Sequence, residues 1–223
     1  MDDLLTRFFN KTFENKINEA MMYYKYVFPE DEVINFINEL INMQIEDILI
    51  YIKRNKTKID LTSKDIFQFS SLDDSIYKLT RKLKEIKDPG LHHIDIGKLL
   101  LDDGIEREYG AYLKYGENHS KTANEIGLLY KSSNSYFLSC WGYIFNLLEK
   151  DVQSKFLVRL ILRTNLLQHL IKIPDNLIDL RTVCSFLSDS TYTRRKSNIK
   201  SIIGILQNST DYDFTDFCNR IKY

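Results

Sequence analysis

A run of apolar residues at helical spacing between Asp31 and Arg54 constrains the fold more than any other feature of this chain. Pro29 and three acids precede or open the run, and Lys53 and Arg54 close it, which is the charge order that a helix dipole favours. The pattern predicts one long amphipathic helix over 31–54 that packs or dimerises through its apolar face. The apolar positions are Val33, Phe36, Ile37, Leu40, Ile41, Ile45, Ile48, Leu49 and Ile52.

The chain of 223 residues contains only three prolines and eight glycines, which indicates a mainly α protein. The helical pattern is interrupted over 55–71 and again at Pro174. We therefore expect three parts. They are a helical N-terminal region (1–70), a second domain (71–173) and a C-terminal helical unit (174–223).

Composition excludes several classes of protein. No apolar stretch is long enough to cross a bilayer, and the N-terminus lacks the basic and apolar regions of a secretory signal. The three cysteines, Cys140, Cys184 and Cys218, are far apart, which argues against a disulfide framework or a zinc cluster and favours the cytoplasm. Residues 1–50 carry 4 basic against 10 acidic side chains, whereas 151–223 carry 11 against 7. A neutral protein with local basic patches is expected.

The element order after Leu91 is typical of a helix-turn-helix with a wing. We predict a helix over 91–101, a turn at 102–104, a helix over 106–128, and a short extended segment at Tyr136–Leu138 before helix resumes. This order places two helices in front of a strand, so the expected fold is mainly α with winged-helix (helix-turn-helix) type units and short strands.

Three segments resemble the winged-helix DNA-recognition modules of bacterial restriction systems (type II restriction endonuclease-like). The stretch 110–129 is similar to the second and third helices of these modules and closes with Ala123, Gly127 and Leu128, and the step Leu138-Ser-Cys-Trp-Gly142 follows it. A third segment, 193–206, has a threonine, paired arginines and an apolar helix, although Ile203-Gly204 stands where related modules often carry tryptophan. The resemblance covers roughly 73–207 and includes no catalytic signature.

The resemblance implies sequence-specific binding of double-stranded DNA. The chain would be the recognition part or a partner subunit of a restriction-type defence system, with catalysis on another chain. Two alternatives remain open. One is a helical protein-interaction or transcription-regulatory protein without direct DNA contact, with a partner protein or a second copy bound through helix 31–54. The other is a metal-dependent nuclease.

The helix over 106–128 is the first candidate DNA-binding element. Lys114, Asn118, Lys121 and Thr122 recur at helical spacing and form a polar stripe with Glu125. Asparagine and lysine can donate hydrogen bonds to base edges in the major groove, and lysine also contacts phosphate. We expect Asn118 and Lys121 to be the main readers of base sequence. The opposite side of this helix is expected to pack on the core through Tyr109, Leu113 and Ala123.

The second candidate is a basic stretch expected to begin a helix near residue 190. Ser190, Thr191 or Thr193 could cap it, and four cations follow without an acid before Thr210. Cations at a helix start gain nothing from the helix dipole, so the arrangement favours a phosphate docked there. The four cations, all predicted to contact DNA, are Arg194, Arg195, Lys196 and Lys200.

The nuclease alternative depends on Asp74, Glu85 and Lys87, which have the spacing of an acid–acid–lysine metal-nuclease motif. The carboxylates would bind Mg²⁺ and the lysine would activate water or contact the phosphate. The segment looks helical, whereas that chemistry usually occupies a strand hairpin. His92 and His93 point about 100° apart on a helix and cannot easily share an ion, so we predict no metal site and no cofactor outside the nuclease alternative.

Overall fold

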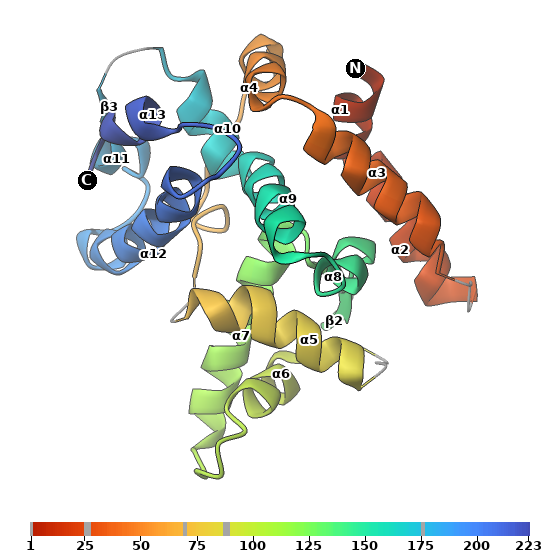
Figure 1. Ribbon diagram of the computed structural model, residues 1–223. Coiled ribbons are helices and arrows are strands. Elements are labelled where there is room, and N and C mark those ends of the chain that lie inside the picture. The colour runs from red at the N-terminus through yellow and green to blue at the C-terminus, as the bar shows by residue number, and fades with distance from the viewer. Residues whose placement is uncertain (1, 25–27, 69–70, 87–89, 175–176) are drawn as a thin grey trace. The chain divides into compact units, whose positions relative to one another are not determined.

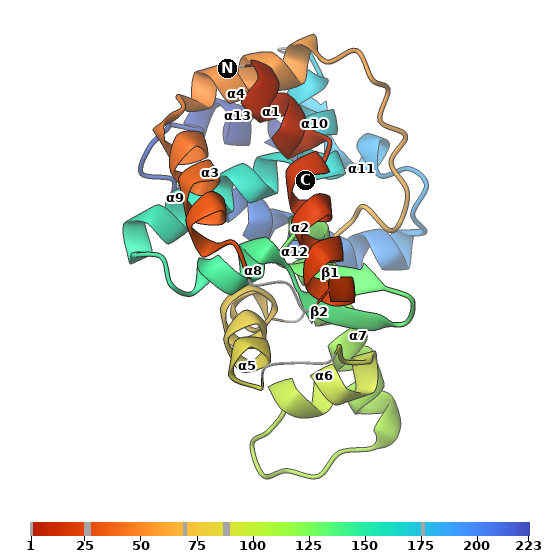
Figure 2. The ribbon, with the colours of Figure 1, turned by 90° about the vertical axis from the view of Figure 1, so that its right-hand side faces the viewer.

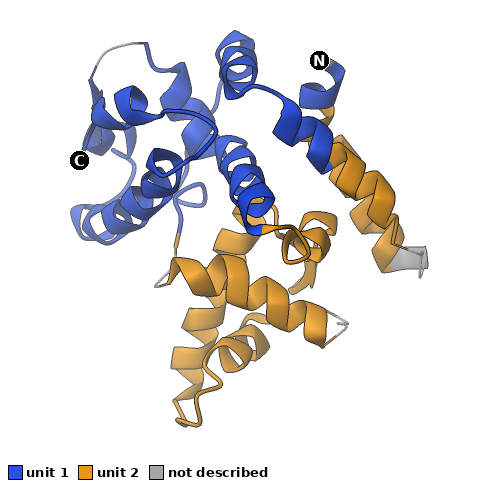
Figure 3. Cartoon of the chain, viewed as in Figure 1, with its two compact units in different colours: residues 1–6, 37–67, 150–223 blue, residues 7–36, 68–149 orange. Residues whose placement is uncertain are grey.

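The computed structural model is mainly helical with a few short strands, as the sequence predicts (Figures 1 and 2). It describes residues 2–24, 28–68, 71–86, 90–174 and 177–223. No helix in these ranges combines the length and the apolar character that crossing a membrane requires. The described residues form two compact units, each assembled from segments distant in the sequence (Figure 3). Unit 1 comprises 1–6, 37–67 and 150–223, and unit 2 comprises 7–36 and 68–149. Each unit therefore contains residues from more than one of the three parts expected from the sequence.

Unit 2 consists of helices and one β-hairpin. Its elements are α2 (Thr12–Tyr24), the first part of α3 (Glu30–Asn42), the π-helical turn η1 (Asp74–Lys78), α5 (Leu79–Glu85), α6 (His93–Leu100), α7 (Tyr109–Ile126), β1 (Leu129–Ser132), β2 (Ser135–Leu138) and α8 (Cys140–Phe145). The strand expected at 136–138 is confirmed. Helix α7 starts three residues later than expected and runs through Gly110 and Gly116 without a break.

Helices α6 and α7 pack closely because two glycines lie in their interface. A Cβ on Gly97 would lie 1.9 Å from the Tyr112 carbonyl oxygen, and one on Gly116 would lie 1.8 Å from the His93 carbonyl oxygen. Any larger side chain at either position would force the two backbones apart. Leu79, Ile96, Leu100, Ala123 and Tyr136 belong to the buried cluster that these helices share with α5 and the hairpin.

The hairpin also pairs with one residue that precedes α6. Strands β1 and β2 pair antiparallel from Leu129↔Leu138 to Ser132↔Ser135. Leu91, just before α6, exchanges two backbone hydrogen bonds with Tyr136 (N···O distances 3.0 and 2.9 Å). The helix predicted from residue 91 therefore begins only at His93, because Leu91 is paired with a strand.

The two short motifs singled out in the sequence join α7, the hairpin and α8. Gly127 adopts φ 98° and ends α7, while the Leu128 amide donates to the Ala123 carbonyl at 2.8 Å. Ser139 caps α8 by accepting a hydrogen bond from the Gly142 amide (3.0 Å) and donates one to the Gly127 carbonyl (2.7 Å). These residues are therefore explained by helix capping and chain reversal.

Unit 1 is built around buried helices of the C-terminal third of the chain. Its elements are the end of α3, α4 (Ile45–Arg54), α9 (Lys150–Leu162), α10 (Asn165–Lys172), β3 (Ile178–Asp179), α11 (Leu180–Val183), α12 (Asp189–Gln207), α13 (Thr215–Asn219) and β4 (Ile221–Lys222). Helix α1 (Asp2–Phe9), like α3, has residues assigned to both units. Strands β3 and β4 pair parallel.

The single helix predicted over 31–54 is wrong: α3 ends at Asn42 and α4 begins at Ile45. The break is stabilised by the fully buried guanidinium of Arg159, which donates to the carbonyls of Leu40 (2.6 Å), Ile41 (2.9 Å) and Met43 (3.0 Å). These are carbonyls that a helix end leaves without partners. The apolar positions on both sides of the break are mostly buried within the chain. Of the two roles expected for this apolar face, packing and dimerisation, the structure shows packing within the chain.

The apolar residues at helical spacing between Asp151 and Ile173 are also divided between two helices, α9 and α10. Thr164 adopts an extended conformation between α9 and α10, and its hydroxyl donates to the Ile161 carbonyl at 2.8 Å. Helix α10 then packs against α4. The apolar spacing continues across this break as well, so periodicity alone could not reveal it.

Candidate nucleic-acid interface

One side of α7 carries the predicted polar stripe to the surface of unit 2. Lys114 and Lys121 are exposed, Asn118 and Glu125 are partly exposed, and Gly110 continues the stripe toward the start of the helix. The Lys121 ammonium pairs with the Glu117 carboxylate one turn earlier, and this contact lowers the pKa of Glu117. The stripe therefore offers two cations and an amide at spacings of about one helical turn.

Two of the expected core contacts of α7 are wrong. Ala123 is fully buried, but Tyr109 is 67% exposed and Leu113 is 37% exposed. The buried side of the helix instead contains six residues, most of them small or polar, and Gly116 among them lies where α6 approaches closely. They are Gly116, His119, Ser120, Thr122, Ala123 and Ile126.

Thr122 lies inside unit 2 and not on the polar stripe. Its side chain is 1% exposed, and its hydroxyl donates to the Gln68 carbonyl (3.0 Å) and accepts from the Gln68 amide (3.3 Å). This pair of bonds anchors the segment before η1 to α7. Thr122 is consequently a scaffold residue.

The basic helix α12 starts earlier than the sequence suggested. Its N-cap is Ser188, whose hydroxyl accepts from the Thr191 amide (3.4 Å), and not Ser190, Thr191 or Thr193. Asp189 occupies the first turn and pairs with Arg181 at 2.6 Å. The cations therefore lie beyond the first turn, and phosphate contact through the amides of the helix start is not supported.

The four cations of α12 have different surroundings. Arg194 is exposed and bonds only weakly to its own helix, at 3.4 Å from the Ser190 carbonyl. Lys200 is exposed, with its ammonium 4.7 Å from the centre of the Tyr223 ring. Lys196 is partly exposed. Arg195 donates to the carbonyls of Ile66 and Phe67, and burial lowers the pKa of its guanidinium.

The exposed face of α12 also has a row of hydroxyls that the sequence pattern alone did not single out. Ser190, Thr193, Ser197 and Ser201 are all exposed and follow one another at intervals of three or four residues. The signal was available as helical spacing, but the start of the helix had to be known before the face could be assigned. Together with Arg194 and Lys200 they form a polar surface, and Asp189, which is paired with Arg181, borders it at the start of the helix.

The residues of the nuclease alternative do not form a metal site. Asp74 and Glu85 occupy one continuous helical segment and lie eleven positions apart, or about 16 Å along its axis. One ion with oxygen ligands at about 2 Å cannot contact both carboxylates. Asp74 accepts a hydrogen bond from the Tyr115 hydroxyl and pairs with Lys78 at 3.6 Å. Lys87 lies outside the described residues.

The histidines of unit 2 participate in internal hydrogen bonds. His93 Nδ1 lies 2.9 Å from the Ser120 hydroxyl, and the fully buried His119 lies with Nδ1 2.6 Å from the Ser75 hydroxyl. Burial lowers the pKa of His119 to about 4. Within the described ranges, no three His, Cys, Asp or Glu side chains are grouped so that they could hold a metal ion.

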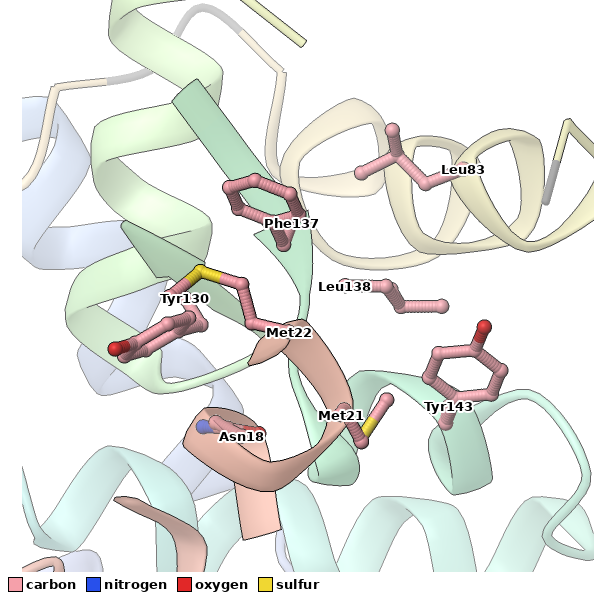
Figure 4. A pocket seen from close by; sticks show the side chains of 8 residues that line it. All are labelled: Asn18, Met21, Met22, Leu83, Tyr130, Phe137, Leu138 and Tyr143. Atoms are coloured by element: carbon pink, nitrogen blue, oxygen red, sulfur yellow. The ribbon is translucent and has the colours of Figure 1, made fainter. Parts of the chain in front are cut away.

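Unit 2 also contains a small, mostly apolar cavity of about 110 Å³ (Figure 4). This volume is well below the roughly 300 Å³ at which small-molecule sites begin. The lining residues are Asn18, Met21, Met22, Leu83, Tyr130, Phe137, Leu138 and Tyr143. The cavity is better explained as imperfect packing around two flexible methionines than as a ligand site.

Comparison of the chain with protein-family models, with curated proteins and with solved structures gives no match.

Proposed function

We propose that this protein binds double-stranded DNA in a sequence-specific manner. The observation that supports the proposal best is the exposed stripe of α7, in which Lys114, Asn118 and Lys121 face solvent while the opposite side of the helix packs on α6. An α-helix fits the major groove, where amide and ammonium groups can distinguish base pairs. Helix α7 is the reading helix of unit 2 in this proposal.

The element order of unit 2 supports a winged-helix interpretation. A helix (η1 and α5), an extended residue paired with the hairpin, two closely packed helices and the β1–β2 hairpin follow in that order. In a helix-turn-helix the second helix of the pair enters the major groove. That position corresponds to α7, and the hairpin would be the wing.

Unit 1 supplies a second reading helix in the same proposal. Helix α12 is the second of the pair α11–α12, and β3 precedes this pair. Its exposed Arg194 and Lys200 can donate hydrogen bonds to phosphates or to guanine. Its serine and threonine hydroxyls can form hydrogen bonds with phosphates and with any base. Arg195, which bonds within unit 1, is not among the proposed contacts.

The resemblance of 110–129 and 193–206 to restriction-type modules suggests the biological setting. The chain would supply DNA recognition in a defence system, and cleavage would be carried out by a partner chain. This part of the proposal depends on the resemblance alone, whereas the DNA contacts depend on the exposed side chains described above.

Binding to a pool of random duplexes, measured by fluorescence anisotropy over a series of salt concentrations, tests the proposal. We expect Lys114→Ala with Lys121→Ala to weaken binding. The slope of the logarithm of the binding constant against the logarithm of the salt concentration should become shallower by about 0.9 for each phosphate contact that is lost. Arg194→Ala with Lys200→Ala should behave similarly. Lys16→Ala with Lys53→Ala removes two exposed charges elsewhere and serves as the matched control. Equal binding by all three double variants would refute the proposed contacts.

A further inference from the structure

Three apolar side chains in unit 2 are exposed to solvent in the loop between α6 and α7 and in the first part of α7. Ile105 is 61% exposed, Tyr109 is 67% exposed and Leu113 is 37% exposed. Tyr109 and Leu113 are four residues apart on α7, so they share one side of that helix, and Ile105 precedes them in the loop. We call Ile105, Tyr109 and Leu113 the tip surface. Grouped apolar side chains in solvent commonly mark an interaction site.

The loop is held in a defined conformation by its own hydrogen bonds. The Ile105 amide donates to Asp103 (3.1 Å), and the Ile105 carbonyl accepts from Arg107 (2.9 Å) and from the Tyr112 hydroxyl (3.3 Å). Arg107 also pairs with Asp103 at 2.6 Å, and its backbone amide donates to the Tyr112 hydroxyl at 3.1 Å. The backbone around Ile105 is therefore fixed while its side chain remains exposed. An anchor fixed before binding loses little conformational entropy when a partner docks.

Four acidic residues lie close to the tip surface in the sequence. Asp102, Asp103, Glu106 and Glu108 are all exposed. Asp103 pairs with Arg107 and Asp102 pairs with Lys82 at 3.6 Å, so Glu106 and Glu108 leave this group of side chains with a net negative charge. Acids near the start of α7 suit the helix dipole. The dipole gives no reason for three exposed apolar side chains beside them.

We propose that the tip surface binds a protein segment that combines aliphatic or aromatic side chains with lysine or arginine. Apolar side chains of the partner would cover Ile105, Tyr109 and Leu113, and its cations would face the surrounding carboxylates. Nucleic acid does not fit this surface, because its phosphates would meet an excess of carboxylates. A second copy of the chain does not fit through the same surface, since a symmetric contact would bring the two acidic rims together.

This surface is separate from the proposed DNA contacts. Leu113 and Lys114 point about 100° apart around the axis of α7, so the apolar side and the polar stripe are different faces of one helix. A partner on the tip surface would leave Lys121 accessible. The inference therefore does not depend on DNA binding.

Selection of short random peptides displayed on phage, with the full chain as bait, tests the inference. Peptides retained by the parent protein are counter-selected against Ile105→Ser with Tyr109→Ser. We expect the enriched peptides to carry both basic and apolar residues. As isolated peptides they should bind the double variant at least about tenfold more weakly, the loss expected when an interface anchor is removed. Glu106→Gln with Glu108→Gln should weaken binding and reduce its salt dependence.

Ile86→Ser with Leu147→Ser is the matched control, because both residues are exposed apolar side chains elsewhere in unit 2. Thermal unfolding and duplex binding of each variant are measured in parallel. The inference is wrong if no peptide depends on the tip surface, or if the enriched peptides are acidic. It is also wrong if Ile105→Ser with Tyr109→Ser weakens duplex binding, or if sedimentation shows a dimer that only this variant loses.

Discussion

Arg194 and Arg195 are neighbours in the sequence but have different surroundings in the structure. The Arg194 side chain is exposed on α12, whereas that of Arg195 bonds to the carbonyls of Ile66 and Phe67. Asn198, one turn later, donates to the same Phe67 carbonyl at 3.0 Å. Arg194 therefore has a surface position and Arg195 a structural one, although the sequence around them is too similar to distinguish the two.

We expect Arg195→Ala to lower the free energy of unfolding by about 1–3 kcal/mol, because two backbone acceptors lose a charged donor. Arg194→Ala should leave the unfolding free energy within about 0.5 kcal/mol of the parent value, as is usual for exposed positions, while weakening duplex binding. Urea denaturation and duplex binding of both variants distinguish the roles. Equal unfolding curves for the two variants would contradict this assignment.

His119 links the stability of unit 2 to pH. It is buried beside Ser75, and burial lowers its pKa to about 4, while Asp74 opposes this shift and Lys78 adds to it. In the unfolded chain its pKa is about 6.5. Between these two values the unfolded state binds a proton that the folded state does not, so stability falls as pH is lowered from about 7 to about 4.

The expected decrease in stability over this interval is roughly 2–3 kcal/mol from His119. Denaturant midpoints measured at several pH values test it. His119→Asn, which keeps a polar partner for Ser75, should flatten the pH dependence in that range and leave the smaller contribution of His93, whose pKa burial also lowers. An unchanged slope in His119→Asn would exclude His119 as the titrating group.

The pairing of α6 with α7 depends on the absence of side chains at two positions. Gly97 and Gly116 each bring backbone against backbone, whereas a methyl group on Gly110 of the same α7 helix would have no neighbouring atom within 4 Å. A helix prefers alanine to glycine for entropic reasons. Close packing therefore explains why glycine is needed at the two interface positions, whereas it does not explain Gly110.

Gly116→Ala should destabilise the protein by about 1–3 kcal/mol or more, because the methyl group meets backbone that cannot move aside. Gly110→Ala, the matched control on the exposed side of α7, should stabilise it by about 0.5–1 kcal/mol. Thermal unfolding of both variants measures the difference. If Gly116→Ala were as stable as Gly110→Ala, the close approach of α6 and α7 would be incorrect.

The chain as a whole carries one proposed reading helix in each unit. If both contact DNA, Asn118→Ala in α7 and Arg194→Ala in α12 should alter the preference at different base pairs, each by about 1–3 kcal/mol. Contacts that act independently contribute additively, so the double variant should show both changes. Selection of preferred sequences with the three variants tests this. A change confined to one helix would leave the other out of the recognition surface.

Local spacing in the sequence was sufficient to predict the mainly helical class, the strand at 136–138 and the polar stripe of α7. These features depend on residues a few positions apart, whose relation follows from helix and strand geometry. The same spacing could not predict the break after Asn42. Arg159, which stabilises that break, lies 119 positions beyond the carbonyl of Leu40 to which it bonds.

Tertiary structure also decided which candidate residues reach solvent. Thr122 and Arg195 look like surface polar groups in the sequence, but segments distant along the chain bond to them, while no part of the described chain covers Tyr109 and Leu113 enough to bury them. Spacing along a helix determines which side chains share a face. Whether that face meets protein or water depends on the rest of the fold, and this is why helical spacing indicated the polar faces of α7 and α12 but not the tip surface.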